Sequence, residues 1–233
     1  MIFLKTDEEI SLMREANHLV GHTLGELAKW VQPGISTKRL DQIAEEFIRD
    51  NGGVPGFKGY EGFPGTLCIE VNDEVVHGFP SDYILKDGDI VGLDCGVVLN
   101  GYNGDSCYTY PVGNVKESIL HLLKTTKESL YLGIEQAKVG NRIGHIGFAI
   151  QDYCEHKGYS VVRELTGHGI GQKLHEDPDV PNYGRKGVGP LLRLGMCICI
   201  EPMINEGSKN IVCDRNGWTI RTRDHKWSAH YEH

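Results

Sequence analysis

The chain has 233 residues, of which 39% are hydrophobic and 24% charged, and its formal net charge is −8. This length suits one large domain or two small ones, and the composition allows a buried core and excludes a disordered chain. The negative charge argues against binding to nucleic acid or anionic membranes through a basic face, and the longest apolar run, Met196 to Ile200, is far shorter than the ~20 residues of a membrane span.

The N-terminal residues and the cysteines indicate a reducing compartment. Lys5, Asp7 and Glu8 occupy positions where a signal peptide would be apolar. The seven cysteines include no C-x-x-C pair, so neither a zinc ribbon nor a thioredoxin-like motif is supported. We therefore expect free thiols and a cytoplasmic protein.

The first half of the chain is predicted to form two helices followed by strands. Thr6-Asp7-Glu8-Glu9 matches a capping box, and apolar residues follow it at helical spacing. The predicted elements are a helix that begins after Thr6 and is stopped by Pro33-Gly34, a helix from Thr37 to Asp50, a loop from Gly52 to Gly65, and strands near 67–71, 90–98 and 104–110.

The second half repeats this order. Helices are expected over Lys116 to Ala137 and Ile143 to Lys157, and strands near 160–164, 196–201 and 227–232. Four positions match at an offset of 106 residues: Gly34 with Gly140, Leu40 with Ile146, Phe47 with Tyr153, and Gly52 with Gly158. We predict a single α+β domain over residues 1–233, built from related halves at about 6–112 and 115–233.

A short turn brings two aspartates onto one face of the predicted sheet. Asn100-Gly101 is typical of a type I′ hairpin turn, which needs positive φ at both positions. With these residues as the loop, Asp94 faces Cys107 and Gly96 faces Asp105. The aspartates are then diagonal neighbours with β-carbons about 7–8 Å apart, close enough to share a cation. Taken alone, each aspartate is more simply explained by a turn or a sheet edge.

Three further residues are candidate ligands. His168 lies among the glycines of Gly167-His168-Gly169-Ile170-Gly171, which allow close approach of backbone and ligand. Glu201 and Glu232 end two apolar stretches. Alone, the histidine is more simply a structural residue, and each glutamate a salt-bridge partner or a cap. Together with the two aspartates they supply four carboxylates and one imidazole, which suit two divalent ions such as Mn, Fe, Co or Zn.

Along essentially its whole length the sequence resembles the type 1 methionine aminopeptidases. The segments that carry the resemblance are Cys68 to Gly78, Asp94 to Asp105, Gly167 to Gly171, Ile200-Glu201-Pro202 and Ser228 to His233. Only 33 residues separate His168 from Glu201, which leaves no room for the inserted subdomain of the type 2 enzymes. The resemblance implies a pita-bread fold, in which two pseudo-symmetric halves form a curved antiparallel sheet covered by helices.

The resemblance also implies a dinuclear metal centre. Asp105 and Glu232 would bridge both ions, Asp94 would complete one site, and His168 with Glu201 would complete the other. The implied reaction removes the N-terminal methionine of nascent proteins and peptides when the second residue is small, by attack of a metal-bound hydroxide.

Further roles follow from the same resemblance. Glu201 would also shuttle the proton, His175 would stabilise the oxyanion or the departing amide, and His77 would lie beside the scissile nitrogen. Both histidines would contact substrate, and the implied methionine pocket consists of Tyr60, Phe63, Cys68, Leu174 and Trp218.

Two features depart from the family pattern. Relatives often have an aromatic residue at the position of Leu174, which affects how closely the pocket fits methionine. The chain ends at His233, one residue after Glu232, where relatives continue into another strand. We therefore expect either a truncated C-terminal strand or a frayed chain end that carries Glu232.

Two other functions are compatible with this fold. A proline-specific aminopeptidase or dipeptidase would carry an N-terminal domain and an extra histidine, for which this chain is too short. A non-catalytic binding module would have lost ligands, whereas all five positions are intact. The expected partners are N-terminal methionines of nascent polypeptides, with the ribosome as a further candidate. We expect a monomer without nucleic-acid specificity or membrane attachment.

Overall fold

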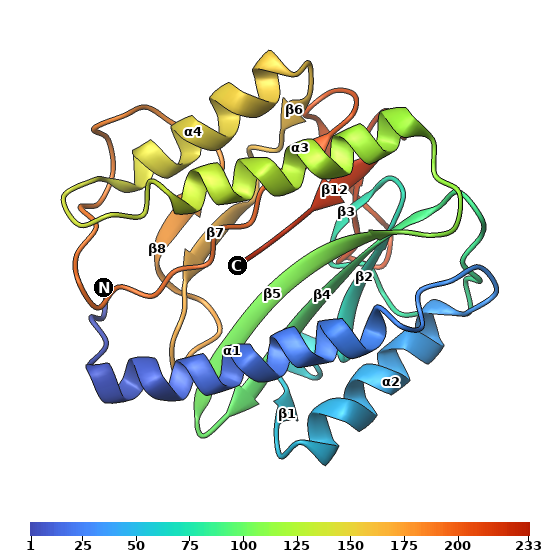
Figure 1. The fold of residues 1–233 in the computed structure, drawn as a ribbon, viewed down its shortest axis with the longest axis horizontal. Coiled ribbons are helices and arrows are strands. Elements are labelled where there is room, and N and C mark those ends of the chain that lie inside the picture. Colours follow the sequence, from blue (N-terminus) through green and yellow to red (C-terminus); the bar gives the residue numbers. More distant parts are fainter.

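The computed structural model describes residues 1–233 and has the predicted α+β architecture (Figure 1). Its elements are α1 (Asp7–Leu27), α2 (Thr37–Asp50), β1 (Val54–Pro55), the 3-10 helix η1 (Tyr60–Gly62), β2 (Leu67–Val71), β3 (Glu74–Val76), β4 (Ile90–Leu99), β5 (Tyr102–Pro111), α3 (Glu117–Ile134), α4 (Ile143–His156), β6 (Ser160–Val161), β7 (Thr166–Gly169), β8 (Glu176–Pro181), β9 (Met203–Asn205), β10 (Ile211–Cys213), β11 (Ile220–Thr222) and β12 (Ser228–His230).

The helices begin where the sequence signals predicted. The Thr6 side chain accepts a hydrogen bond from the Glu9 backbone, and the Glu9 side chain caps Thr6 in return, so the capping box of α1 is complete. Helix α2 has the predicted bounds. Helix α1 ends at Leu27, six residues before Pro33, because residues 28–30 turn out of the helix.

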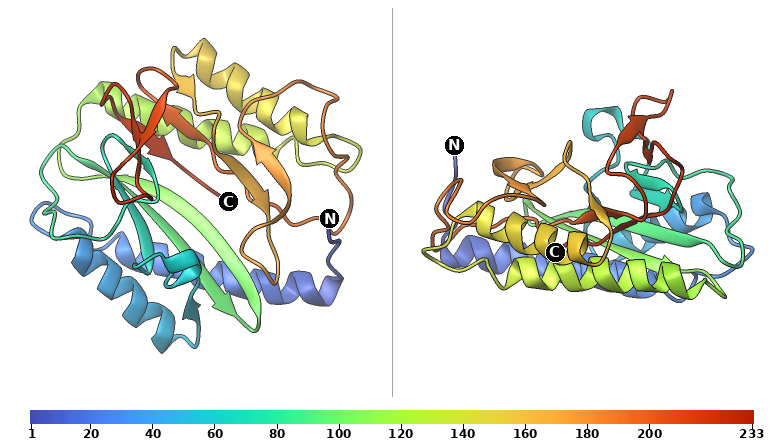
Figure 2. Two further views of the ribbon diagram at one scale, coloured as in Figure 1. Left: turned by 180° about the vertical axis from the view of Figure 1, so that it is seen from behind. Right: turned by 90° about the horizontal axis from the view of Figure 1, so that it is seen from above.

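The second pair of helices is placed like the first. Helices α2 and α4 begin at Thr37 and Ile143 and end at Asp50 and His156, an offset of 106 residues at each end. Figure 2 shows the four helices on one side of the strands, with the short hairpins and loops on the other. Each pair covers its own apolar cluster, one centred on Leu40 and one on Ile146, both fully buried.

One predicted strand is wrong. Residues 196–201 form no regular ladder, and only Ile198 makes an isolated bridge, to Gly169. Their hydrogen bonds go to two different neighbours, since the Cys199 N–H donates to the His168 carbonyl and the Ile200 N–H donates to the His233 carbonyl. The segment 196–201 therefore lies between two other segments of the same chain and is not part of a regular sheet.

Other strand predictions need smaller corrections. The strand expected near 160–164 is limited to β6, and the predicted loop 52–65 contains β1 and η1. Strands β3, β7, β8, β9, β10 and β11 were not predicted. Strand β8 contains two prolines and three acidic residues, a composition depleted in strands, so local propensity gives no signal for it.

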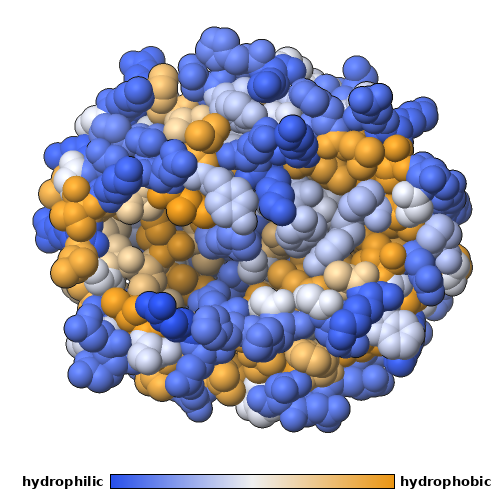
Figure 3. Space-filling view, in the orientation of Figure 1, coloured by the Kyte–Doolittle hydropathy of each residue, from blue (hydrophilic) through white to orange (hydrophobic).

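The face seen in Figure 3 is mixed in character: hydrophilic side chains cover most of it, and hydrophobic side chains show at its left edge, in the hollow beside that edge and at its upper right. None of the helices combines the length and apolar character needed to cross a bilayer.

Candidate metal centre and active site

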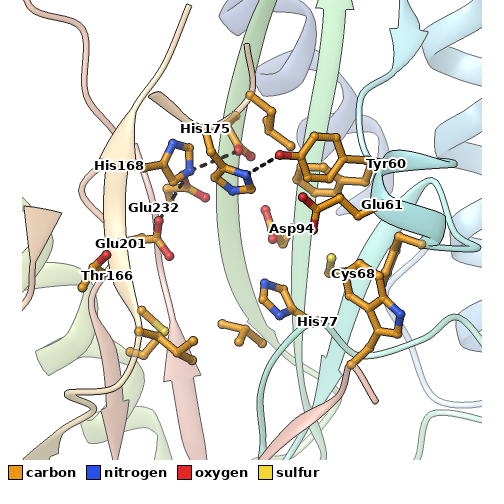
Figure 4. A pocket seen from close by; sticks show the side chains of 18 residues that line it. Tyr60, Glu61, Cys68, His77, Asp94, Thr166, His168, His175, Glu201 and Glu232 are labelled. Atoms are coloured by element: carbon orange, nitrogen blue, oxygen red, sulfur yellow. Dashed lines mark hydrogen bonds and ion pairs between the residues drawn. The ribbon is translucent and has the colours of Figure 1, made fainter. Parts of the chain in front are cut away.

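The β4–β5 hairpin holds the two predicted aspartates in the predicted register. Leu99 pairs with Tyr102 across the turn, and Asn100 and Gly101 have φ values of 53° and 81°. Asp94 lies opposite Cys107, and Asp105 lies opposite Gly96. Both carboxylates therefore lie on one face, where they line the same cavity (Figure 4).

The other three candidates reach this cavity from separate segments. His168 lies on β7, Glu201 is the last residue of the segment 196–201, and Glu232 follows β12. The Nε2 atom of His168 lies 3.9 Å from Asp105 Oδ2 and 3.7 Å from Glu201 Oε1. A donor atom of Glu232 lies within 4.8 Å of those of Asp105 and His168.

Close backbone packing explains the glycines around His168. A Cβ atom at Gly167 would lie 2.3 Å from the Cys199 carbonyl oxygen, and one at Gly169 would lie 2.2 Å from that of Asp177. Only glycine fits at such distances. These contacts fix the backbone on both sides of the histidine and direct its ring into the cavity.

The ring orientation of His168 suits metal binding. Its Nδ1 atom lies 2.9 Å from the Gly169 carbonyl oxygen, which makes Nδ1 the proton donor and leaves Nε2 as a lone-pair donor toward the carboxylates. Burial lowers the pKa of His168 to about 4, with a further contribution from His175. The imidazole is therefore neutral at neutral pH, as a metal ligand must be.

The four carboxyl groups destabilise one another's charge. Burial raises the pKa of Asp94 to about 7. Burial also raises the pKa values of Asp105, Glu201 and Glu232, and in each case neighbouring carboxylates of the same group raise it further. A divalent cation would remove this repulsion.

Buried oxygen atoms without hydrogen-bond partners also indicate a cation site. Asp94 Oδ1, Asp105 Oδ1 and Glu232 Oε1 are buried and have no hydrogen-bond partner. Buried polar atoms are normally paired, because leaving one unpaired costs about 1–3 kcal/mol. The five residues thus fit a centre for divalent metal ions in donor type, convergence and charge.

Two histidines flank these carboxylates. His175 Nδ1 lies 2.9 Å from the Tyr60 hydroxyl, and the His175 ring centroid lies 4.3 Å from that of His168. His77 lies on the opposite side of the cavity, toward Trp218 (Figure 4). Burial, followed by the effect of His175, lowers the pKa of His77 to about 4. Its φ of 58° is unusual for a non-glycine residue and is typical of functional sites.

An apolar compartment adjoins the polar group. The cavity has a volume of about 210 Å³. All the residues predicted for the methionine pocket line it: Tyr60, Phe63, Cys68, Leu174 and Trp218. The Phe63 and Trp218 rings pack edge to face with centroids 5.3 Å apart. The structure thus brings all twelve predicted site residues to one cavity.

Six lining residues were missed by the sequence analysis: Phe57, Glu61, Val76, Leu165, Thr166 and Met203. Thr166 directly precedes the glycine segment of His168, so its place in the motif was a usable signal. Glu61 lies in the loop that carries Tyr60 and has a φ of 49°, which nothing in the local sequence indicates.

Comparison with known proteins gives consistent matches. The model of metallopeptidase family M24 matches residues 11–233. The chain is 53% identical over 233 residues to methionine aminopeptidase 1 of Bacillus subtilis, covering 100% of this chain and 94% of the relative. It is 54% identical to a methionine aminopeptidase of Clostridium perfringens, covering 100% and 93%.

A solved structure shows the same fold. The crystal structure of methionine aminopeptidase from Rickettsia prowazekii matches with a TM-score of 0.99 and 40% identity, covering 100% of this chain and 94% of that one. The predicted pita-bread fold is therefore confirmed. Sequence and structure agree that the chain belongs to metallopeptidase family M24, among its methionine aminopeptidases.

Proposed function

We propose that the chain removes the N-terminal methionine from peptides and nascent proteins whose second residue is small. One observation carries this proposal: the apolar compartment opens directly onto the five-residue metal centre within a single cavity. A methionine side chain can therefore fill the compartment while its own carbonyl group lies among the carboxylates. The relatives named as methionine aminopeptidases support the same function.

The metal centre would hold two divalent ions, of Co, Mn, Fe or Zn. Asp105 and Glu232 would contact both ions, Asp94 would complete one site, and His168 with Glu201 would complete the other. When bound, such ions polarise the scissile carbonyl group and lower the pKa of water. Carboxylate and imidazole donors bind all four of these metals, so the types of ligand do not indicate which metal is bound.

The protein side chains would handle protons and developing charge. Glu201 would take a proton at its carboxylate from the attacking water and pass it to the departing amide nitrogen. His175 would donate a hydrogen bond to the oxyanion, with the Tyr60 hydroxyl holding its Nδ1 atom in place. His77 would lie beside the scissile nitrogen. Its low pKa keeps it neutral, so it adds no positive charge that would repel the substrate amino group.

The apolar compartment would select the first residue by shape. Phe63, Trp218 and Leu174 offer aromatic and aliphatic surface, and Cys68 adds a sulfur atom, all suited to an unbranched thioether. Leucine or norleucine changes the side-chain volume little, so discrimination against them should be only about 10–200-fold.

Assays on four peptide types test the proposed function. We expect rapid release of methionine from Met-Ala-Ser and slow or no release from Met-Lys-Ser, because the second residue would lie against His77 and the loop 62–65. An N-acetylated peptide should not react, since acetylation removes a charge attracted to the carboxylates. Efficient cleavage of Xaa-Pro peptides without methionine would contradict the proposal and favour a proline-specific peptidase.

We further propose that residues 1–233 act as one catalytic domain with halves at about 6–112 and 115–233. The protein would work as a cytoplasmic monomer on chains emerging from the ribosome. Free cysteines are consistent with a reducing compartment. Sedimentation of the purified protein, with and without ribosomes, tests the oligomeric state and the association.

A further inference from the structure

A second group of donor side chains lies behind the wall of the active-site cavity. It consists of Glu70 on β2, Cys107 on β5 and His230 on β12, which we call the Glu70 cluster. One donor atom of each residue lies within 4.8 Å of the donor atoms of the other two. Each residue is at most 3% exposed, and none of the three lines the cavity.

The polar atoms of the Glu70 cluster lack partners. Both carboxylate oxygens of Glu70 and both ring nitrogens of His230 are buried without a hydrogen bond. The Cys107 thiol makes only a weak contact, at 3.6 Å from the His230 carbonyl oxygen. Leaving such groups unpaired in a core costs several kcal/mol in total. A native fold rarely tolerates this, so a ligand among the three side chains is the simplest explanation.

The surrounding strands hold these side chains in place. Glu70 lies over Gly92, where a Cβ atom would come 2.7 Å from Glu70 Oε2, so glycine makes the space for this carboxylate. The Thr109 hydroxyl donates to the His230 carbonyl at 2.6 Å and accepts from the His230 N–H at 3.1 Å. The backbone of His230 is therefore fixed beside β5. The three side chains of the Glu70 cluster are thus held close together by the surrounding strands.

We propose that the Glu70 cluster binds a third divalent cation of the zinc type, separate from the ions of the five-residue centre. A thiolate, an imidazole and a carboxylate are the three donor types that zinc prefers. The thiolate and the carboxylate together balance the charge of one divalent ion. Zinc–ligand distances of about 2.0–2.3 Å place donors about 3.3–3.8 Å apart, so donor atoms within 4.8 Å of one another need to close by at most about 1.5 Å.

Such an ion would be structural. It would join β2, β5 and β12, and His230 lies two residues before Glu232 on the same segment. The ion would therefore fix the chain end that supplies one ligand of the metal centre. It would also offset the repulsion between Glu70 and Asp94, which adds to burial in raising the pKa of Glu70.

Zinc X-ray absorption on the full chain tests the proposal without any assay of peptidase activity. The protein is loaded with zinc, desalted and analysed for metal content and for the atoms around zinc. We expect a third equivalent of zinc and a sulfur atom at about 2.3 Å. Cys107→Ser should lose the sulfur signal and one equivalent of zinc, and His230→Gln should lose the same equivalent. The result stands whether or not the protein proves to be a methionine aminopeptidase.

Cys199→Ser is the matched control. Cys199 is also buried, and its sulfur lies within 4.8 Å of donors of Asp105, His168 and Glu232, so it is one competing source of a sulfur ligand. Cys68 is the other, because its sulfur lies within 4.8 Å of donors of Glu70 and Asp94, and Cys68→Ser serves as a second control. We expect both control variants to keep the sulfur signal. The proposal is overturned if the native protein shows no sulfur around zinc, or if either control loses the signal while Cys107→Ser keeps it. Absence of sulfur around zinc in the native protein overturns the proposal even if a variant fails to fold.

Discussion

His175 lies at the exposed rim of the cavity, hydrogen-bonded to Tyr60, while the carboxylates and His168 lie deeper. This placement separates two kinds of residue. Side chains deep in the cavity have unpaired atoms that suit a metal ion, whereas His175 has one nitrogen committed to Tyr60 and the other free for substrate. Metal content and turnover should therefore respond differently to substitutions in the two groups.

We expect His175→Ala to lower kcat by about 10²–10³-fold with little change in metal content, because it removes stabilisation of transition-state charge and no ligand. Asp105→Ala should instead lose bound metal, since this carboxylate is one of the proposed metal ligands and lies among the donors of His168 and Glu232. Metal analysis and kinetics on both variants check this. Equal metal loss in the two variants would contradict the assignment of His175.

The residues of the site were predictable to different degrees. The shared face of Asp94 and Asp105 followed from the turn sequence, because the turn fixes the register of every pair in the hairpin. Their roles as metal ligands came from the resemblance. The roles of His77 and His175 came only from the resemblance, since a lone histidine carries no spacing signal. Glu61 and Met203 were missed because their approach to the cavity depends on contacts far apart in the sequence.

At the scale of elements, the β4–β5 hairpin determines the geometry of the site. Gly101 has a φ of 81°, and no atom beyond its chain neighbours lies within 4 Å of its Cβ position. A side chain there would therefore lower stability only through the strained backbone conformation and not through a steric clash. The same two strands carry Asp94 and Asp105. Stability of the turn is therefore linked to the metal centre.

We expect Gly101→Ala to destabilise the protein by about 1 kcal/mol, because alanine disfavours this left-handed conformation. The matched control is Gly21→Ala in the middle of α1, where the Cβ position is also open but the backbone is helical. This control should stabilise the protein by about 0.5–1 kcal/mol. Urea unfolding of both variants measures the difference, and destabilisation of equal size in both would show that the turn carries no special strain.

Strand β11 depends on one arginine. Arg221 forms ion pairs with Asp73 and Glu74 beside β3 and with Asp214 after β10, at 2.5–2.7 Å. The segment before β11 carries Trp218, and the residue after β3 is His77. Arg221 therefore ties together the two strands that present one side of the cavity.

We expect Arg221→Gln to lower the free energy of unfolding by about 2 kcal/mol, because three carboxylates lose their shared partner; the partial exposure of Arg221 keeps the loss below that of a fully buried pair. The control Arg39→Gln removes a single pair, with Glu46 on the surface, and should change stability by at most about 0.5 kcal/mol. A similar small change in both variants, measured by thermal or urea unfolding, would contradict the role of Arg221.

Element prediction succeeded where signals were local. Capping and periodicity located the helices, and the turn located β4 and β5. The segment 196–201 looked like a strand because apolar residues alternate in it, but its partners, at residues 168–170 and 233, offer no continuous edge. Short strands such as β10 and β11 have only three residues each, too few for a periodic pattern.

In the whole molecule, two helical pairs at an offset of 106 residues cover the strands, and the candidate metal ligands come from both the β4–β5 hairpin and residues 168–232. The offset was visible in the sequence through paired glycines, and Gly34, Gly52, Gly140 and Gly158 all adopt positive φ. How the halves meet was not derivable from residue patterns, because contacts between them are long-range. The predicted arrangement of the two halves around one sheet rested on the resemblance to the family.

Metal and pH should act together on the stability of the whole protein. In the folded, metal-free protein the carboxyl groups bind protons more tightly than in the unfolded chain, as the raised pKa of Asp94, about 7, indicates. Their contribution to stability is therefore full below the unfolded pKa near 4 and is lost as pH rises through about 7. We expect the melting temperature of chelated protein to fall between pH 5 and 8.

Metal-loaded protein should not show that fall, because the ions replace the protons. The gap in melting temperature between loaded and chelated protein should thus widen with rising pH. Differential scanning calorimetry at four pH values checks this. A gap that stays constant or narrows would show that the buried carboxylates are not the metal ligands.

Removal of N-terminal methionine should require metal held by the five residues, and an assay with chelation and metal replacement examines this requirement. Release of methionine from Met-Ala-Ser is measured after chelation and again as Co, Mn, Fe or Zn is added back, for the native chain and for Asp105→Ala. We expect loss of release on chelation, recovery with added metal, and no recovery in the variant. Release that survives chelation, or that recovers equally in Asp105→Ala, would contradict this requirement.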